Sequence, residues 1–180
     1  KKHPPTSGNL DDYGASFSEF IADFAPAKNL AYLPDVARFE FLYHECLLSE
    51  EKILNEEKLI GLSAEQFANL KFTFNPSAQF FTSQFSILKI WQMTKQESPE
   101  ELDLQNAPGD NLIILRKNNE ICFVPLEENE KEFLLLLKEK KNIGEALEIV
   151  EKKNPEFDLA FYMQKHLVSG TFSEIYLLRI

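Results

Sequence analysis

Apolar residues recur at helical spacing along the first part of the chain. The first such run contains Phe17, Phe20, Ile21 and Phe24. These positions share one helical face, and the helix should end before Pro26. A second helix begins at Pro34 and is apolar on most of its circumference, which is typical of a helix at the centre of a bundle.

Residues 63–94 alternate between helical and extended patterns. Ser63 and Gln66 form a capping-box signature, which predicts a short helix up to about residue 70. Alternation over 71–74 predicts a short extended piece, and the apolar stretch that follows predicts a helix over about 83–94. Periodicity is lost over 96–111, a segment with two prolines and a glycine, so we place a domain boundary there.

The pattern after residue 111 is clearer. Two apolar runs, 112–117 and 120–126, flank Asn118-Asn119, a pair that tolerates positive φ and predicts a tight hairpin. A helix with an acidic first turn and a basic end follows, then helices that begin after the capping residues Asn142 and Asp158. Gly170 should close the last helix, and the apolar tail 175–180 predicts a strand.

These elements predict an α+β protein of two domains. Residues 1–105 form a helical N-terminal domain, and residues 106–180 form a winged-helix-like domain with a β-hairpin, three helices and a C-terminal strand. No apolar run reaches the roughly 20 residues that span a bilayer, and from the opening Lys1-Lys2-His3-Pro4-Pro5 we expect no signal peptide. Two distant cysteines do not make a disulfide framework, so a reduced, cytoplasmic setting fits best.

Composition and charge narrow the function. The chain has 180 residues, a net charge of −10 and 16 Phe. The acidic balance weighs against duplex binding, which depends on Lys and Arg at the phosphates. Many Phe rings must pack internally or against a partner, because exposing them to water is unfavourable.

No catalytic constellation is evident in the sequence. Glu40, His44 and Cys46 have helical spacing that could supply three metal ligands, but the remaining His residues are distant, and packing roles are favoured. Serines lack a nucleophile motif, and with six Gly there is no phosphate-binding loop. We therefore expect a protein that is not an enzyme and that needs no cofactor or metal.

The last helix allows two uses of a winged helix. As a DNA-recognition helix it offers Gln164 and Lys165, but it begins at acidic residues, and a DNA reader needs a basic face. As a peptide-binding helix it would lie beside the free hairpin edge, where an extended peptide adds as a strand. The candidate peptide-binding residues are Ile121, Phe123 and Val124 on the hairpin, facing Phe161, Tyr162 and Lys165 on the helix. Simple core packing is the alternative for these side chains.

Three blocks of sequence resemble one bacterial family. They are His3–Phe20 (with HPPxSGxL and YGxxFxxF), Tyr32–Glu40 (YLxDVARFE) and Pro76–Phe85 (PSxxxxxSxF). Together they resemble the HvfC/BufC family of peptide-modification chaperones, once labelled DNA-binding proteins. Asn75 departs from the His that usually precedes Pro-Ser, and the family's N-terminal helical domain is missing ahead of Lys1, so we expect a truncated chain.

The resemblance implies a partner role. Family members act beside a multinuclear iron oxidase-like enzyme that modifies cysteines of a ribosomally made precursor peptide. Residues 112–170 are similar in pattern to PqqD-like recognition elements, which hold a leader peptide as an added strand. Phe39, Glu40 and Tyr43 on the central helix are then candidates for docking the enzyme. The expected function is a non-catalytic adaptor, with a DNA-binding transcriptional regulator and a purely structural domain as the alternatives.

Overall fold

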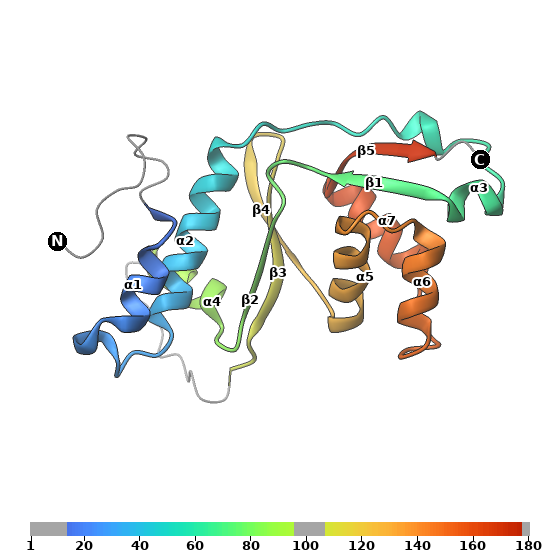
Figure 1. Ribbon diagram of the computed structural model, residues 1–180. Coiled ribbons are helices and arrows are strands. Elements are labelled where there is room, and N and C mark those ends of the chain that lie inside the picture. Colours follow the sequence, from blue (N-terminus) through green and yellow to red (C-terminus); the bar gives the residue numbers. More distant parts are fainter. Residues whose placement is uncertain (1–13, 96–106, 178–180) are drawn as a thin grey trace.

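A computed structural model describes residues 14–95 and 107–177 and shows a mixed α+β fold (Figure 1). Within these ranges the chain forms seven α-helices and two small antiparallel sheets, which confirms the expected class. The first range contains α1 (Phe17–Asp23), α2 (Leu33–Leu48), α3 (Ala64–Ala68), β1 (Leu70–Phe74), β2 (Gln79–Ser83) and α4 (Ile87–Met93), with 3-10 turns at Ala25–Ala27 and Glu56–Leu59. The second contains β3 (Asp110–Lys117), β4 (Glu120–Pro125), α5 (Glu128–Lys138), α6 (Ile143–Glu151), α7 (Leu159–Ser169) and β5 (Phe172–Leu177).

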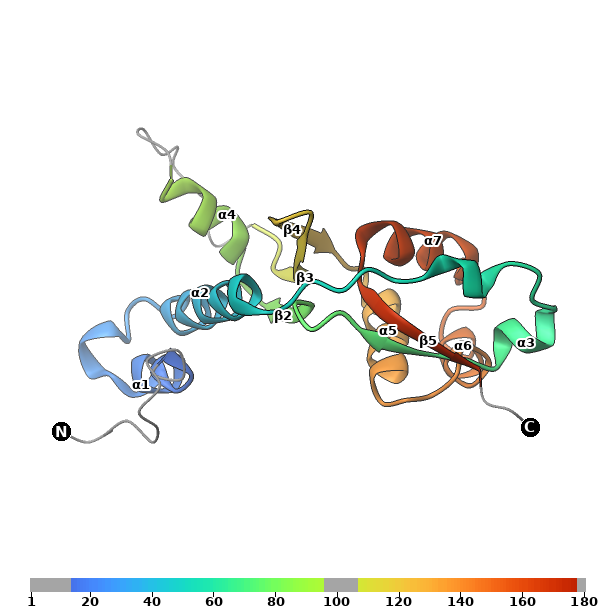
Figure 2. The ribbon, with the colours of Figure 1, turned by 90° about the horizontal axis from the view of Figure 1, so that it is seen from above.

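A three-stranded sheet in the order β2-β3-β4 stands in the middle of the molecule. Helices α1, α2 and α4 lie on one side of it, and α5, α6 and α7 lie on the other (Figures 1 and 2). Leu112 and Ile114 of β3 point into the cluster on the α2 side, and Ile113 and Leu115 point into the cluster on the α5 side. Both faces are covered, which is why β3 reads as a continuous apolar run.

The second sheet pairs β1 with β5, and residues of both strands pack into the cluster that contains α5. Phe72 of β1 lies opposite Ile175, and the ring of Phe72 packs on Phe172 with 4.4 Å between centroids. Phe72 and Phe172 belong to the same buried cluster as Phe133 of α5. Residues of both sheets and of helices α5, α6 and α7 therefore share one buried cluster.

The signals at the ends of the elements are confirmed. Capping boxes form at Ser63 and at Asn142, and the Asp158 side chain accepts a hydrogen bond from the Phe161 N–H. Both hairpin residues, Asn118 and Asn119, have positive φ, as the tight turn requires. Gly170 ends α7 in the left-handed conformation. These features are local in sequence, and the sequence predicted them.

The helix predicted over about 83–94 is present but starts later than expected, and the strand before it was not predicted. Phe80 and Phe81 belong to strand β2, which pairs with β3, and α4 begins only at Ile87 instead of about Ser83. The Ser83 hydroxyl accepts a hydrogen bond from the Phe85 N–H and donates one of 2.6 Å to Asp35 of α2. Because β2 is stabilised by pairing with a strand that comes some 30 residues later in the chain, its apolar run cannot be distinguished locally from a helix.

Strand pairing crosses the predicted domain boundary. The boundary itself, at residues 105/106, lies outside the described residues, as do the start of the first sequence block and the last three residues of the predicted C-terminal strand. On either side of it, β1 pairs with β5 and β2 pairs with β3. The first part of the chain thus supplies one strand to each sheet.

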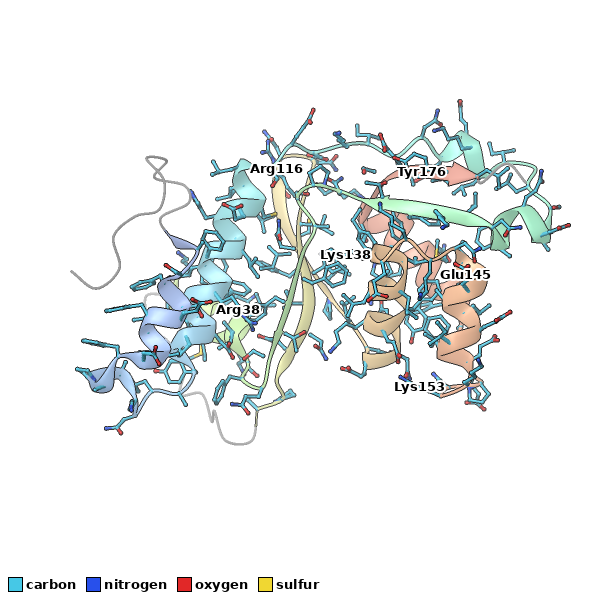
Figure 3. All side chains as sticks on the ribbon, viewed as in Figure 1. Arg38, Arg116, Lys138, Glu145, Lys153 and Tyr176 are labelled. Carbon is cyan, nitrogen blue, oxygen red and sulfur yellow. The ribbon has the colours of Figure 1, made fainter. Side chains whose placement is uncertain are left out.

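The hairpin tip is fixed to the segment after α2. Glu51 accepts hydrogen bonds from the backbone N–H groups of Asn118 (2.8 Å) and Asn119 (3.2 Å), and these bonds lower the pKa of Glu51. Arg116 donates to the Leu47 carbonyl at 2.9 Å, and Figure 3 shows its side chain near the end of α2. The β3–β4 hairpin is therefore held in a defined position against the N-terminal helices.

Candidate functional site

The outer edge of β4 is unpaired in the described chain. The sheet order places β4 at an edge, and β5 pairs with β1 instead of β4. In antiparallel ladders, residues alternate between those that bond to the partner strand and those whose backbone points away. The Leu126 N–H donates to the Asn111 carbonyl at 2.8 Å, which fixes this alternation. Ile121, Phe123 and Pro125 therefore direct their backbone groups outward.

Two lysines join helix α7 to the β3–β4 hairpin. The outward carbonyl of Pro125 accepts a 2.6 Å hydrogen bond from Lys165 Nζ, and Lys117 at the other end of the hairpin donates to the Val168 carbonyl. Phe161, Lys165 and Val168 share one face of α7 by their spacing. The side chains of Phe161 and Val168 are 56% and 64% exposed. We call the outward backbone of β4 together with this face of α7 the edge site.

The structure divides the predicted peptide-binding residues between two faces. Val124 and Tyr162 are buried together in the α5-side cluster, as expected for a hairpin that faces α7. Ile121 and Phe123 point the other way and pack on the α2 side, so the prediction that they face α7 was wrong. The reason is the two-residue period of a strand, which sends neighbouring residues such as Phe123 and Val124 to opposite faces. Their assignment to peptide binding stays a prediction.

The predicted docking residues are also separated. Phe39 is fully buried, with its ring 5.2 Å from Phe81 and 5.8 Å from Phe123, so it is a core residue and not an accessible docking residue. Tyr43 is half-buried and packs on Trp91 at 4.9 Å. Glu40 is exposed. Only Tyr43 and Glu40 of this group retain surface through which a partner could bind.

A buried polar network connects α5 to the α7 residues of the edge site. Glu130 of α5 is fully buried, and its Oε1 lies 2.6 Å from Lys165 Nζ and 2.8 Å from His166 Nε2. A carboxylate can only accept, so His166 carries its proton on Nε2, while its Nδ1 lies 2.9 Å from the Thr171 hydroxyl. Lys165 thus bonds to both Glu130 and Pro125, and it fixes α7 against the end of β4.

Burial and hydrogen bonding act in opposite directions on Glu130. Burial raises its pKa, but hydrogen bonds from His166, Lys165 and the Glu127 N–H outweigh burial and lower it overall. In the same region, burial and a 2.7 Å hydrogen bond to Glu127 raise the pKa of Tyr162 to about 12. Both groups therefore keep their usual charge at neutral pH, with the carboxylate ionised and the phenol protonated.

The residues of two sequence blocks have structural roles in the fold. Asp35 accepts from Ser83 and forms a 3.2 Å ion pair with Arg38, which in turn donates to the Thr82 carbonyl. Asn75, where the resembled family usually has His, is buried and donates to the Lys52 carbonyl at 2.8 Å. These contacts hold β2 against α2 and the residue before the third block against the segment after α2, so they position the sheet that carries the edge site.

The residues considered as metal ligands do not converge. Cys46 is buried, and this burial raises its pKa to about 11, whereas Glu40 and His44 are exposed. No group of three or more His, Cys, Asp or Glu residues in the described ranges is placed to hold a metal ion. Across the same ranges, none of the helices has both the length and the hydrophobicity needed to cross a bilayer.

Sequence reasoning missed three contributors to the site. Trp91 of α4 packs on Phe123 of β4, the Val168 carbonyl of α7 accepts from Lys117 at the end of β3, and Glu130 forms an ion pair with Lys165. Trp91 and Val168 carry no signal beyond their apolar character. Glu130 was detectable in part, because Glu127 and Glu130 have capping-box spacing and do form that box.

Comparisons with models of protein families, with curated proteins and with solved structures found no match for this chain. The edge site is therefore interpreted from its own geometry and from the sequence blocks described above.

Proposed function

We propose that this protein is a non-catalytic, cytoplasmic accessory protein that holds a ribosomally made precursor peptide as an added strand on β4. It would present that peptide to a partner enzyme of the multinuclear iron oxidase-like kind. The observation that carries the proposal is the outward, unpaired backbone of Ile121 and Phe123 in the edge strand β4.

Backbone geometry favours an extended peptide as the ligand. Ile121 and Phe123 each offer one outward N–H and one outward carbonyl, so an added strand gains about four backbone hydrogen bonds. Apolar contact is also available, since Val168 exposes its side chain at the end of α7 whose backbone accepts a hydrogen bond from Lys117 of the hairpin. The β3–β4 hairpin followed by α5, α6 and α7 supports the winged-helix assignment, which is the arrangement of PqqD-like peptide-recognition elements.

The DNA-binding alternative receives less support from α7. The only Lys or Arg in this helix is Lys165, and its ammonium is ion-paired with buried Glu130. The exposed residues beside it are Gln164, Phe161 and Val168, and none of them neutralises a phosphate. A recognition helix of this composition does not suit a polyanion, whereas it suits an apolar peptide.

Hydrogen exchange tests the strand-addition step. We expect a short, cysteine-containing open reading frame beside this gene, and its synthetic leader is the probe. We expect it to protect the amides of Ile121 and Phe123 and to leave those of the β1–β5 sheet unchanged. Ile121→Pro removes one outward N–H without touching the ladder to β3, and it should weaken binding about tenfold, whereas Ile121→Val should not. Full protection elsewhere with an unprotected β4 would refute the proposal.

Presentation to the enzyme is tested separately. We expect an iron oxidase-like protein to be encoded beside this gene and to co-purify with the accessory protein. Peptide modification by the pair should be lost with the Ile121→Pro variant. Modification that proceeds equally well without the accessory protein would contradict the adaptor role.

A further inference from the structure

We infer that the outer edge of β2 is a second strand-addition site, and that it takes an extended acidic segment of a partner protein. The segment would carry two adjacent carboxylate side chains, one directed to Lys138 and the other to Arg38. This edge is the opposite one from β4, so the inference goes beyond the proposed function and does not depend on it.

Strand β2 is the second edge of the three-stranded sheet, because no described strand pairs with its outer side. The hydrogen bond that fixes the alternation at the β4 edge directs the backbone of Asn111 towards β4, so its neighbour Leu112 bonds to β2. Leu112 pairs with Phe81. The residues on either side of it, Phe80 and Thr82, therefore direct their backbone groups outward.

Three of these outward groups are open. Arg38 of α2 donates to the Thr82 carbonyl, which agrees with the alternation. The Thr82 N–H and both backbone groups of Phe80 have no hydrogen-bond partner among the described residues. An added strand would thus gain about three backbone hydrogen bonds at this edge.

One basic side chain lies on each side of β2, as Figure 3 shows for Arg38 and Lys138. The Arg38 guanidinium is 4.9 Å from the ring centroid of Phe81, which belongs to the cluster on the α2 side. The Lys138 ammonium is 4.8 Å from the ring centroid of Phe80, which packs against the cluster on the α5 side. Each face of the sheet therefore has one cation next to this edge.

Both cations can bind a further anion. Lys138 is exposed and forms no ion pair within the described part of the chain. Arg38 bonds to Asp35 and Thr82 through Nη2, so Nε and Nη1 remain as donors, and its side chain is 43% exposed. The net charge of −10 is spread over the whole chain, and charges farther apart than about 8 Å are largely screened at physiological ionic strength.

The alternation of a strand sets the spacing of the two carboxylates. Directly paired residues on neighbouring strands point their side chains to the same face of the sheet. A residue opposite Phe80 would therefore point towards Lys138, and the next residue, opposite Phe81, would point towards Arg38. Two carboxylates separated by one residue lie on the same face, so they reach only one of these cations.

Three synthetic peptides with fluorescein and identical Gly-Ser flanks test this preference. Their centres are Thr-Val-Glu-Glu-Val-Thr, its neutral analogue Thr-Val-Gln-Gln-Val-Thr, and the isomer Thr-Glu-Val-Glu-Val-Thr. Fluorescence anisotropy measures their affinity for the full chain, and amide exchange at Phe80 and Thr82 reports where they bind. The adjacent pair should bind about fivefold more tightly than the neutral peptide and about twofold more tightly than the isomer of equal charge. Both differences should shrink as salt is added.

Protein variants assign the preference to particular groups. Lys138→Gln should reduce the fivefold preference to about twofold, whereas Lys152→Gln, at an exposed position after α6, should leave it unchanged. Thr82→Pro removes one outward N–H and should weaken binding of the adjacent-pair peptide about tenfold, whereas Thr82→Val should not. Arg38 is left intact because it also holds the Thr82 carbonyl.

The outcomes separate this site from the one on β4. Protection of Phe80 and Thr82 with unchanged exchange at Ile121 and Phe123 would support the inference. If no peptide protects Phe80 and Thr82, strand addition to β2 is wrong, and the proposed function at β4 is unaffected. Equal binding of the acidic and neutral peptides, or a preference that persists in Lys138→Gln, would overturn the acidic partner. A dimer whose Phe80 and Thr82 amides are protected without peptide would show that a second copy occupies the edge instead.

Discussion

Glu130 connects the edge site to the core, and its replacement by alanine should strongly destabilise the protein. Its Oε1 accepts from Lys165 Nζ at 2.6 Å and from His166 Nε2 at 2.8 Å, and its Oε2 accepts from the Glu127 N–H at 2.9 Å. Lys165 retains Pro125 and some solvent after truncation, but His166 is 1% exposed and cannot be hydrated. Removing one partner of such a buried pair costs about 3–5 kcal/mol.

The conservative change Glu130→Gln separates charge from shape. The amide oxygen can still accept from one of the donors, and the side-chain volume is unchanged, so the expected cost is about 1–2 kcal/mol. A matched control is Glu132→Gln on the same helix, which removes an exposed ion pair with Lys153. That pair should be worth less than about 1 kcal/mol.

The pH dependence gives an independent signature. The pKa of Glu130 is lower in the folded than in the unfolded protein, so the folded state binds its proton less tightly. This contribution to stability is fully present above the ordinary Glu pKa of about 4.3 and is lost as the pH falls through the folded pKa. The stability difference between wild type and Glu130→Gln should therefore shrink below about pH 4.3.

Urea unfolding followed by circular dichroism at pH 7 and at pH 3 measures these free energies. Wild type, Glu130→Ala, Glu130→Gln and Glu132→Gln are compared under identical salt. A loss below about 1 kcal/mol for Glu130→Ala, or a difference from Glu130→Gln that does not change with pH, would refute the reasoning.

Three further predictions concern the core and the hairpin. Phe39→Ala should cost about 3–5 kcal/mol in urea unfolding, whereas Glu40→Gln on the same helix should cost less than about 0.5 kcal/mol; equal effects would contradict the burial of Phe39. Cys46 should resist Ellman's reagent in the folded protein at pH 8, because its pKa is about 11, and should react once urea unfolds the chain. Asn119→Gly should raise the free energy of unfolding by up to about 1 kcal/mol, since φ at this position is 69°; a clear destabilisation would argue against the type I′ turn.

The sequence alone determined the features that depend on neighbouring residues. The hairpin turn at Asn118-Asn119, the capping boxes at Ser63 and Asn142 and the left-handed Gly170 are all formed as predicted. Each requires only a few residues whose side chains or φ preferences act on the local backbone. The α+β class followed from these signals and from the spacing of the apolar residues.

Tertiary structure alone decided which strands pair and which face each side chain occupies. Strand β2 forms because β3 lies beside it, and no local pattern distinguishes its Phe80-Phe81 from the start of a helix. Phe123 packs on Phe39 and Trp91 on the α2 side, and Val124 packs on the other side with Tyr162 of α7. The sequence does not reveal this division, because both faces of the sheet are covered and the run is apolar throughout. The edge site therefore became definable only once the alternation of β4 and the position of α7 were known.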